Sequence, residues 1–470
     1  MIYDKVKNNK IIKAICAFQS SDVYIYVLCA IAVLSNAFAL DGFAIALILI
    51  SLCITNLFCD SLMPALPAIF NVAFCISPKN SPAHGDYGYY TSTTFLCVIG
   101  FLVLAVLVTA AVRFFIDKNY KKISFSRGLA SGMVVYAAAL LLNGTFAPGH
   151  DILDFASGAL TVFTFTAIYF FFVAALSEDL NYDYLCKSLV ASGFTVLLQL
   201  GVFYVKNLKN MSDIGNDWKN AIYLGWGISN TAGQYVVMMI LPCFYFAVKK
   251  GKVLTSFVLA GALFSGAFFS LCRSGMLFGA VACVAGVIAA CVFSPKKKKS
   301  IICSLIFGAI AISVFLLAYF NVLFPDLFGF LHNMGFSDRG RYDLWEKSIR
   351  LFYENPLFGA GFNGFSRQYG NAFVLGFAHN TVIQMFASCG VAGVIAYMYQ
   401  RAQLVKLCVH KPHPVRALII GTVCMCLLLG LLDITAFSPY FNIVHAVLVA
   451  FMERESMSDE KFSAAFTAKN

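Results

Sequence analysis

Long apolar runs alternate with short polar segments along most of the chain. Two clear examples are residues 274–294 and 301–320, which contain no charged side chain. Runs of roughly 18 to 20 apolar residues are long enough to cross the hydrocarbon core of a bilayer as helices. They are too long, and alternate too little, to be strands of a membrane barrel. The pattern therefore predicts an all-α, polytopic integral membrane protein with about 12–14 transmembrane helices.

Basic residues gather in short blocks between the apolar runs, and these blocks predict an orientation. The strongest block, Lys296–Lys299, is expected in the cytoplasm, as are both termini. The predicted organisation is N-terminal transmembrane helices over 1–320, an extracytoplasmic loop over 321–378, C-terminal transmembrane helices over 379–452, and a cytoplasmic, disordered tail over 453–470. In this arrangement the polar loop 321–378, where we look for the chemistry, faces outward.

The composition agrees with a membrane protein and argues against a soluble or nucleic-acid-binding protein. The chain of 470 residues is 60% hydrophobic and only 12% charged, which leaves too little polar surface for a soluble globule. Its net charge of +11 comes from the blocks that follow the positive-inside rule, so it does not predict nucleic-acid binding. The 16 cysteines are scattered through apolar runs and are expected to be buried hydrophobes. No metal-type or nucleotide-binding spacing is visible, so no metal and no cofactor are expected.

The polar stretch that begins near residue 337 predicts a surface helix followed by a turn. Residues 342–353 place Trp345, Ile349 and Phe352 on one face and charged side chains on the remainder, which is typical of an amphipathic helix. Asn355-Pro356 should end it. The following residues 359–364 satisfy G-x-G-x-x-G, but no hydrophobic strand precedes them. A tight backbone turn is therefore favoured over a dinucleotide site.

Three arginines and one histidine are the candidate site residues, all expected on the outer side. Arg273 lies at a helix end, and Arg339 and Arg341 lead into the amphipathic helix. A guanidinium fits phosphate oxygens with two hydrogen bonds, so these residues are candidates for a diphosphate site. The alternatives are an interfacial anchor for Arg273 and local ion pairs for the other two. His379 precedes an apolar run; it is a candidate general base or, alternatively, an ordinary polar residue at the interface.

Two further polar residues have less specific interpretations. Asn380, next to the histidine, is expected to cap the helix that follows. Asp433 lies in the last apolar region, where a carboxylate is costly unless it faces protein or water. It could serve function or make a structural polar contact, and the sequence leaves both open.

The motifs of the second half resemble the O-antigen ligase and O-antigen polymerase superfamily, whose members handle undecaprenyl-diphosphate-linked glycans. The resemblance covers about residues 337–400 and is weaker upstream, where Cys272 stands in place of the family's serine before Arg273. Motifs that carry it are G-R-Y-D-L-W-E-K-S, E-N-P-L-F-G-A-G-F-N-G-F, A-H-N and G-V-A-G-V-I.

The resemblance implies a metal-independent, inverting glycosyltransferase of GT-C type in the cell envelope. It would move a glycan from undecaprenyl diphosphate to an acceptor hydroxyl at the outer face of the cytoplasmic membrane, as an O-antigen ligase does. His379 would be the base, with Arg273, Arg341 and Arg339 around the diphosphate. The partners implied are the lipid-linked donor, a glycan, lipid or protein acceptor, and the bilayer. Alternatives are a repeat-unit polysaccharide polymerase and a flippase or exporter of lipid-linked glycan.

Overall fold

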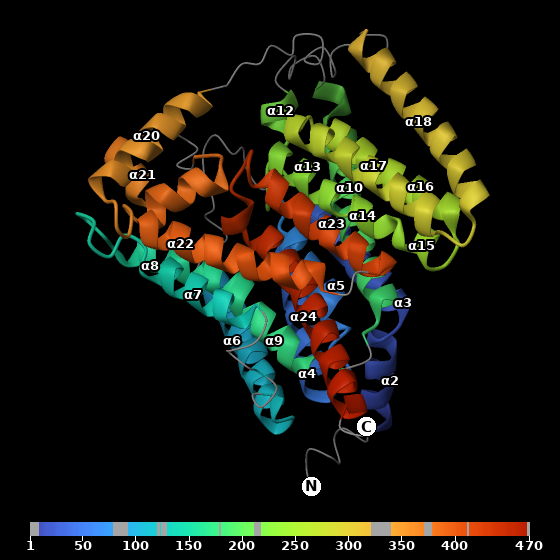
Figure 1. The fold of residues 1–470 in the computed structure, drawn as a ribbon, viewed down its shortest axis with the longest axis horizontal. Coiled ribbons are helices and arrows are strands. Elements are labelled where there is room, and N and C mark those ends of the chain that lie inside the picture. The colour runs from blue at the N-terminus through green and yellow to red at the C-terminus, as the bar shows by residue number, and fades with distance from the viewer. Residues whose placement is uncertain are drawn as a thin grey trace. The chain divides into compact units, whose positions relative to one another are not determined.

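The computed structural model describes residues 9–78, 93–119, 123, 129–177, 180–210, 218–320, 340–370, 378–410 and 413–467. Within these ranges the chain is helical throughout, and the only strand-like pairing is an isolated bridge between Tyr223 and Ile228 (Figure 1). The predicted all-α, polytopic class is therefore confirmed. The chain forms two compact units, and each is built from segments far apart in sequence.

The first unit comprises residues 1–117, 181–335 and 417–422. Its helices are α2 (Lys10–Gln19), α3 (Asp22–Phe38), α4 (Asp41–Phe58), α5 (Ala65–Asn71), α6 (Thr93–Ile116), α10 (Tyr182–Asn207), α12 (Trp218–Ala221), α13 (Ser229–Met238), α14 (Ile240–Cys243), α15 (Tyr245–Val248), α16 (Val253–Phe269), α17 (Arg273–Phe293) and α18 (Lys297–Tyr319).

The second unit comprises residues 118–180, 336–416 and 423–470. Its helices are α7 (Ala130–Leu141), α8 (Ile152–Val162), a π-helical turn η4 (Phe163–Ala167), α9 (Ile168–Ala175), α20 (Arg341–Glu354), α21 (Gly364–Tyr369), α22 (Thr381–Val409) and α24 (Pro439–Thr467). Helix α23 (Pro414–Leu429) has residues in both units.

Eight helices of the described residues are long and apolar enough to cross a membrane, or nine if the bent pair α2 and α3 forms one span. Four shorter apolar helices accompany them: Ala65–Cys75, Ala130–Leu141, Val253–Phe269 and Pro414–Leu429. The predicted number of about 12–14 counted such short runs as full spans. The prediction and the structure therefore differ in how many of the apolar helices are long enough to span the membrane. The predicted multi-pass architecture is unchanged.

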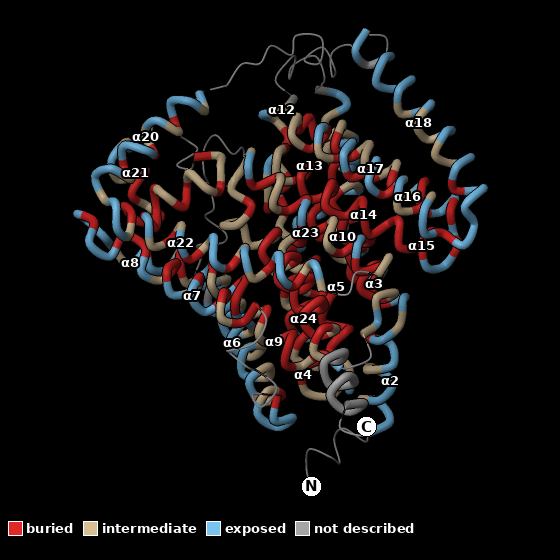
Figure 2. The backbone as a smooth tube through the Cα atoms, viewed as in Figure 1, coloured by how far each residue is buried: buried red, intermediate tan, exposed pale blue. Residues whose placement is uncertain are grey.

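The centre of the first unit is the span Ser229–Val248, of which 94% is buried. It is divided into α13, α14 and α15, and Pro242 in the middle segment cannot continue a regular helical hydrogen-bond pattern. Helices α10, α16 and α17 pack around it. By contrast, α18 is almost entirely exposed along its apolar length, as the pale tube in Figure 2 shows. In a membrane protein such a surface faces lipid or a ligand with a lipid chain.

Two expectations about side chains and termini have clear outcomes. All 16 cysteines are free thiols, and nine of them are buried as expected, whereas five are partly buried and Cys97 and Cys424 are exposed. The region after Glu453, expected to be disordered, instead continues as helix α24 to Thr467. Glu455 near its start accepts from the fully buried Arg416 at 2.5 Å, and His413 Nε2 lies 2.7 Å from the same carboxylate. This network extends the helix beyond the apolar run, which is where the sequence pattern suggested it would end.

Candidate active site

His379 lies in a backbone turn that immediately precedes helix α22. Its φ of 47° is in the left-handed region, which is uncommon for a residue other than glycine. Asn380 follows and caps the helix: its Oδ1 accepts from the backbone amides of Val382 and Ile383 at 2.9 and 3.1 Å. The predicted cap is therefore confirmed. His379 precedes the cap rather than occupying the first helical turn, so its orientation is set by the turn.

The turn that follows α23 forms the other wall of this site. Thr381 N donates to Gly430 O at 2.8 Å, and Asn380 Nδ2 donates to Leu431 O at 2.9 Å. Thr381 Oγ1 also donates to the carbonyl of Asp433 at 3.2 Å. Three hydrogen bonds thus bind residues 430–433 to the beginning of α22, although the two segments are about fifty residues apart in sequence.

This arrangement brings His379 and Asp433 together. Nδ1 of the histidine lies 3.2 Å from Oδ1 of the aspartate, and the same oxygen accepts from Ile434 N at 2.9 Å. Their side chains are 12% and 15% exposed, so the pair is mostly buried but still reachable from solvent. A carboxylate on Nδ1 orients the ring and leaves Nε2 as the nitrogen that can take a proton. Of the two interpretations of Asp433, the structure supports a polar contact made with the candidate base itself.

Helix α20 lies beside this turn and carries Arg341 at its first position. Trp345, one helical turn further along, donates from its indole Nε1 to the carbonyl of Ala378 at 2.7 Å. Residues i and i+4 share a helix face, so Arg341 is on the side of α20 that approaches the histidine turn. Of the three predicted arginines, Arg341 is the one on the helix that makes this Trp345–Ala378 hydrogen bond.

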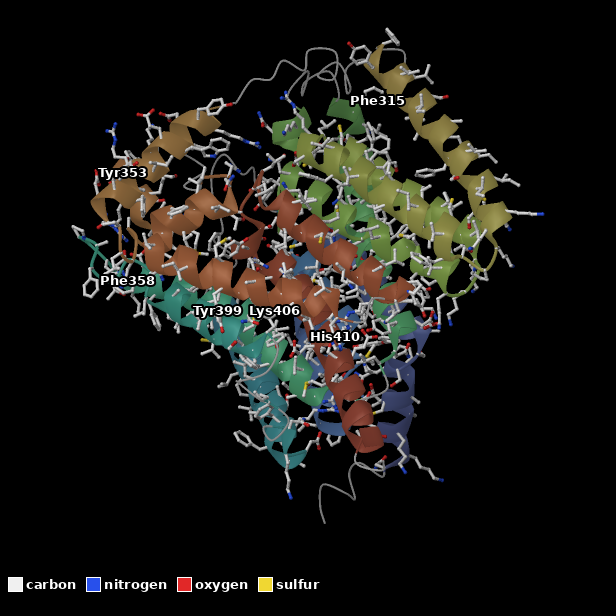
Figure 3. The ribbon with its side chains drawn as sticks, in the orientation of Figure 1. Phe315, Tyr353, Phe358, Tyr399, Lys406 and His410 are labelled. Atoms are coloured by element: carbon white, nitrogen blue, oxygen red, sulfur yellow. The ribbon has the colours of Figure 1, made fainter. Side chains whose placement is uncertain are left out.

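The buried face of α20 differs from the predicted one. Leu344, Ser348 and Leu351 are buried, whereas Ile349 is 42% exposed. The predicted face was wrong by about one residue of rotation, because Leu344 and Leu351 meet a small apolar cluster with Ala360, Phe365 and Ala387. Trp345 and Phe352 lie at the edge of this face, and Tyr353 points away into the exposed surface (Figure 3).

Helix α21 is held against α20 through Tyr369. Its hydroxyl donates to the carbonyl of Lys347 at 3.4 Å, and the Lys347 ammonium lies 5.6 Å from the centre of the ring. Burial raises the pKa of the Tyr369 hydroxyl, so this group remains a hydrogen-bond donor at neutral pH. The contact joins the two short helices into one layer beside the histidine turn.

The other two predicted arginines, Arg273 and Arg339, lie outside the described part of the unit that holds His379. Arg273 is the first residue of α17 in the first unit, so it belongs to a different unit from His379. Cys272 caps α17, because its Sγ accepts from the backbone amide of Gly275 at 3.3 Å. A serine would serve this position in the same way, which accounts for the cysteine in place of the family's serine. Arg339 lies outside the described residues.

The glycine-rich turn is inserted into a break in helix α22. At Gly390 the backbone leaves the helical conformation, with φ of 62° and ψ of −160°. The amides of Ala360 and Gly361 donate to the carbonyls of Ala387 and Ser388 on one side of the break, at 2.7 and 3.1 Å. On its other side, the amides of Val391 and Ala392 donate to Pro356 and Leu357, at 2.9 and 3.1 Å. The turn therefore satisfies backbone groups that the break exposes.

Asp154 lies under the same turn and is completely buried. Its carboxylate accepts from the backbone amide of Asn363 at 2.7 Å and forms an ion pair with Arg367. Gly361 has a φ of 85°, and an added Cβ there would overlap the Asp154 carboxylate. The prediction that these glycines permit a tight turn is confirmed. Phe358 in the turn also packs on Phe146, with ring centres 5.3 Å apart (Figure 3).

Sequence reasoning missed this second cluster. Asp154, whose carboxylate holds the glycine turn, is more than 200 residues away from that turn in sequence. The only sequence signal for this cluster was the D-x-x-D spacing of Asp151 and Asp154. These two residues form a capping box at the start of α8. Among the described residues, no group of three His, Cys, Asp or Glu side chains has the arrangement of a metal site.

Comparison with known families gives a match to one segment of the chain. Residues 257–398 match the family model described as O-antigen ligase. The resemblance to the O-antigen ligase superfamily is confirmed. The match supports an enzyme of the ligase or polymerase type that uses lipid-linked glycan in a membrane. No curated protein matches the chain.

The O-antigen ligase segment includes most of the site described above. It extends from α16 to the middle of α22, and so contains Arg273, Arg341, the glycine turn and His379. It begins about eighty residues upstream of the stretch where the motifs were most evident, and thereby includes the weaker Leu-Cys-Arg-Ser-Gly motif. Asp154 and Asp433 lie outside it, on either side. The two carboxylates that contact the segment's motifs therefore come from regions that the match does not cover.

Proposed function

We propose that the protein is a glycosyltransferase that moves a glycan from undecaprenyl diphosphate to an acceptor hydroxyl at the outer face of the cytoplasmic membrane. The observation that carries this proposal is that His379, inside the segment that matches the O-antigen ligase family, is paired with Asp433, which lies beyond the end of that segment. A histidine oriented by a carboxylate and partly open to solvent is the arrangement that general-base catalysis requires. No other histidine of the described residues combines this partner with the family's A-H-N motif.

In the proposed reaction, Nε2 of His379 takes the proton of the acceptor hydroxyl as its oxygen attacks the anomeric carbon. The bond from that carbon to the diphosphate oxygen breaks on the opposite side, and undecaprenyl diphosphate leaves with the electron pair. Attack in line with the leaving group inverts the anomeric centre. Asp433 holds the ring and offsets the positive charge that the histidine gains.

The arginines are proposed to stabilise the diphosphate as its negative charge grows. Arg341 is the first choice, because α20 is tied through Trp345 to the residue that precedes His379. Arg273 is proposed for the same role from its place in the O-antigen ligase segment, and Arg339 is a further candidate on the grounds of sequence. No step of this scheme uses a metal ion or a cofactor.

The proposed orientation places residues 321–378 outside and both termini in the cytoplasm, supported by the lysines at 296–299. Tyr353 is 75% exposed and suits a test by substitution with cysteine. An impermeant thiol reagent applied to intact cells should label the Tyr353→Cys peptide, identified by mass spectrometry against the native thiols. Labelling that appears only after the membrane is opened would contradict this orientation.

The function is tested with purified protein in liposomes, lipid-linked glycan as donor and a separate hydroxyl-bearing acceptor. Transfer of the glycan to the acceptor, unchanged by a metal chelator and with an inverted linkage, is the expected result. Growth of the lipid-linked glycan on itself would instead identify the polymerase alternative. Movement of intact donor between leaflets without any new glycosidic bond would reject both and favour a flippase or exporter.

A further inference from the structure

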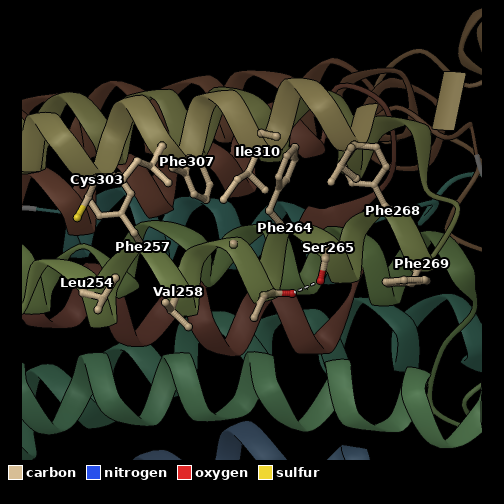
Figure 4. Close-up of a pocket in the computed structure, with 15 residues that line it drawn as sticks. Leu254, Phe257, Val258, Phe264, Ser265, Phe268, Phe269, Cys303, Phe307 and Ile310 are labelled. Carbon is tan, nitrogen blue, oxygen red and sulfur yellow. Dashed lines mark hydrogen bonds between the residues drawn. The ribbon is translucent and has the colours of Figure 1, made fainter. Parts of the chain in front are cut away.

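An apolar groove runs between α16 and α18 in the first unit, with a cavity volume of about 380 Å³ (Figure 4). Such a volume is in the usual range for sites that take a small molecule. Five of the fifteen lining residues are phenylalanines, among them Phe257, Phe264 and Phe268 of α16 and Phe307 of α18. Ser265 is the single hydroxyl of the lining, and it donates to Ala262 O at 2.7 Å. The lining of the groove is therefore almost entirely apolar.

The two walls of the groove meet at Phe307 of α18. Phe257 and Phe307 meet with ring centres 5.7 Å apart, and Gly261 leaves room for the Phe307 ring. Small residues at Ala262 and Ala311 keep the remaining space open. Lining residues Val258 and Ile310 are 60% and 59% exposed, so a chain could enter from the surrounding lipid.

The length of the groove indicates which lipid chain it suits. Lining residues extend from Leu254 to Phe269, nearly the whole of the 17-residue helix α16. At 1.5 Å per residue this is roughly 24 Å, whereas one leaflet accounts for about half of the 30 Å hydrocarbon core. A phospholipid acyl chain would occupy only part of such a groove. A polyprenyl chain is long enough to follow it throughout.

A cationic residue stands at one end. Phe268 and Phe269 close the groove, and a three-residue turn then leads to Arg273 at the first position of α17. Tyr204 fixes this end by donating to Phe269 O at 2.5 Å. An anionic head group next to Arg273 would therefore continue directly into a chain lying between α16 and α18. The N-terminal end of α17 adds the positive end of a helix dipole at the same place.

We propose that this groove binds the polyprenyl tail of the lipid-linked donor, with the diphosphate at the Arg273 end. This rests on the proposed function for the identity of the donor, and adds a tail-binding site formed by α16 and α18. The site would therefore select the substrate by two features, its diphosphate and its long apolar chain. The exposed, apolar helix α18 is then one wall of a binding site.

The test compares two substitutions that lie two residues apart on α18. Ala311→Trp fills the groove, whereas the exposed Ala309 is not part of its lining, so Ala309→Trp is the matched control. Binding of undecaprenyl diphosphate and of inorganic diphosphate is measured on purified, monodisperse protein. We expect Ala311→Trp to weaken undecaprenyl diphosphate binding by at least about tenfold, equivalent to burying roughly 60 Å² less apolar surface. The affinity of Ala311→Trp for inorganic diphosphate should change less than about twofold. The affinity of Ala309→Trp for either ligand should also change less than about twofold.

A second approach keeps the wild-type chain, in case the tryptophan variant does not fold. Undecaprenyl diphosphate with a photoreactive group in its tail should crosslink to peptides of α16 and α18, and excess phosphatidylglycerol should not prevent it. Crosslinks elsewhere, or full competition by phosphatidylglycerol, would show an ordinary lipid-facing surface and overturn the proposal. Normal binding and transfer by a folded Ala311→Trp protein would overturn it as well. If tail-dependent binding persists in a protein that transfers no glycan, the groove stands and the proposed function fails.

Discussion

Two carboxylates of the second unit, Asp154 and Asp433, have opposite surroundings. Asp154 is fully buried and accepts from the amide of Asn363 and from Arg367, with His150 Nδ1 at 3.5 Å. Asp433 is 15% exposed and faces a histidine that is itself reachable. The first carboxylate is surrounded by groups with fixed positions that belong to the glycine turn. The second supports a group whose other nitrogen can exchange a proton.

The difference separates a structural role from a chemical one. A buried carboxylate that is fully paired holds its neighbours in place, and breaking the pair leaves an uncompensated charge. A histidine–carboxylate pair that keeps some contact with solvent costs less to build and can change its protonation during a reaction. The two clusters are also connected: Ala378 N donates to Gln384, and Gln384 donates to Ser388, whose carbonyl accepts from Gly361. Asp154 therefore supports the scaffold on which His379 stands.

The largest expected effect is on catalysis by His379. Replacing it by alanine removes the proposed base, and a positioned base is worth about 10²–10⁴ in rate. We expect His379→Ala to lose this much turnover in the liposome transfer assay while its melting temperature and its binding of undecaprenyl diphosphate stay near those of the wild type. Near-normal transfer by a folded His379→Ala protein would leave the proposed mechanism without its base.

The next largest effect is expected for Asp154, where substitution should reduce stability more than turnover. Asp154→Ala leaves Arg367 and the Asn363 amide without their main partner, and losing one member of a buried pair typically costs about 3–5 kcal/mol. We expect a large fall in melting temperature and in the yield of monodisperse protein. Its remaining folded fraction should show a smaller loss of turnover per molecule than His379→Ala. If Asp154→Ala were stable but inactive, the distinction between the two carboxylates would be wrong.

Local features of this comparison could be predicted from sequence. Asn380 as a cap, the amphipathic helix before Asn355 and the tight turn at Gly359 and Gly361 depend on neighbours within a few residues, where composition and spacing carry the signal. The rotation of α20 could not be predicted, because it depends on Ala387, which lies on another helix. Apolar spacing alone indicated the face of Trp345, Ile349 and Phe352.

Long-range pairings could not be predicted either. Asp433 was recognised as costly in an apolar region, but its partner is 54 residues away. The break at Gly390 was also not evident, since its exposed backbone groups are satisfied by the turn that begins at Pro356. A single sequence contains no direct record of such contacts. The family match confirms the segment that holds His379, and the structure adds the carboxylate that orients it.

Substituting Asp433 tests the histidine pair without removing the base. Asp433→Asn keeps the size of the side chain but removes its charge, so the imidazole loses the partner that orients it. A misplaced reacting group costs roughly 10² in rate, and we expect a loss of this order in turnover with little change in KM for the donor. Full activity of a folded Asp433→Asn protein would make the contact only structural.

The smallest expected effect is a difference in melting temperature between alanine variants of two glycines that both have positive φ. Gly361→Ala brings a Cβ against the buried Asp154, whereas Gly340→Ala, at a φ of 77°, meets nothing within 4 Å. Both variants bear the left-handed strain of roughly 1–2 kcal/mol, and Gly361→Ala bears the overlap as well. We expect Gly361→Ala to lower the melting temperature clearly more than Gly340→Ala, and to reduce turnover through the Gln384 connection. Equal shifts for the two variants would mean that the turn is not held by Asp154, and that the two carboxylates do not differ as their contacts indicate.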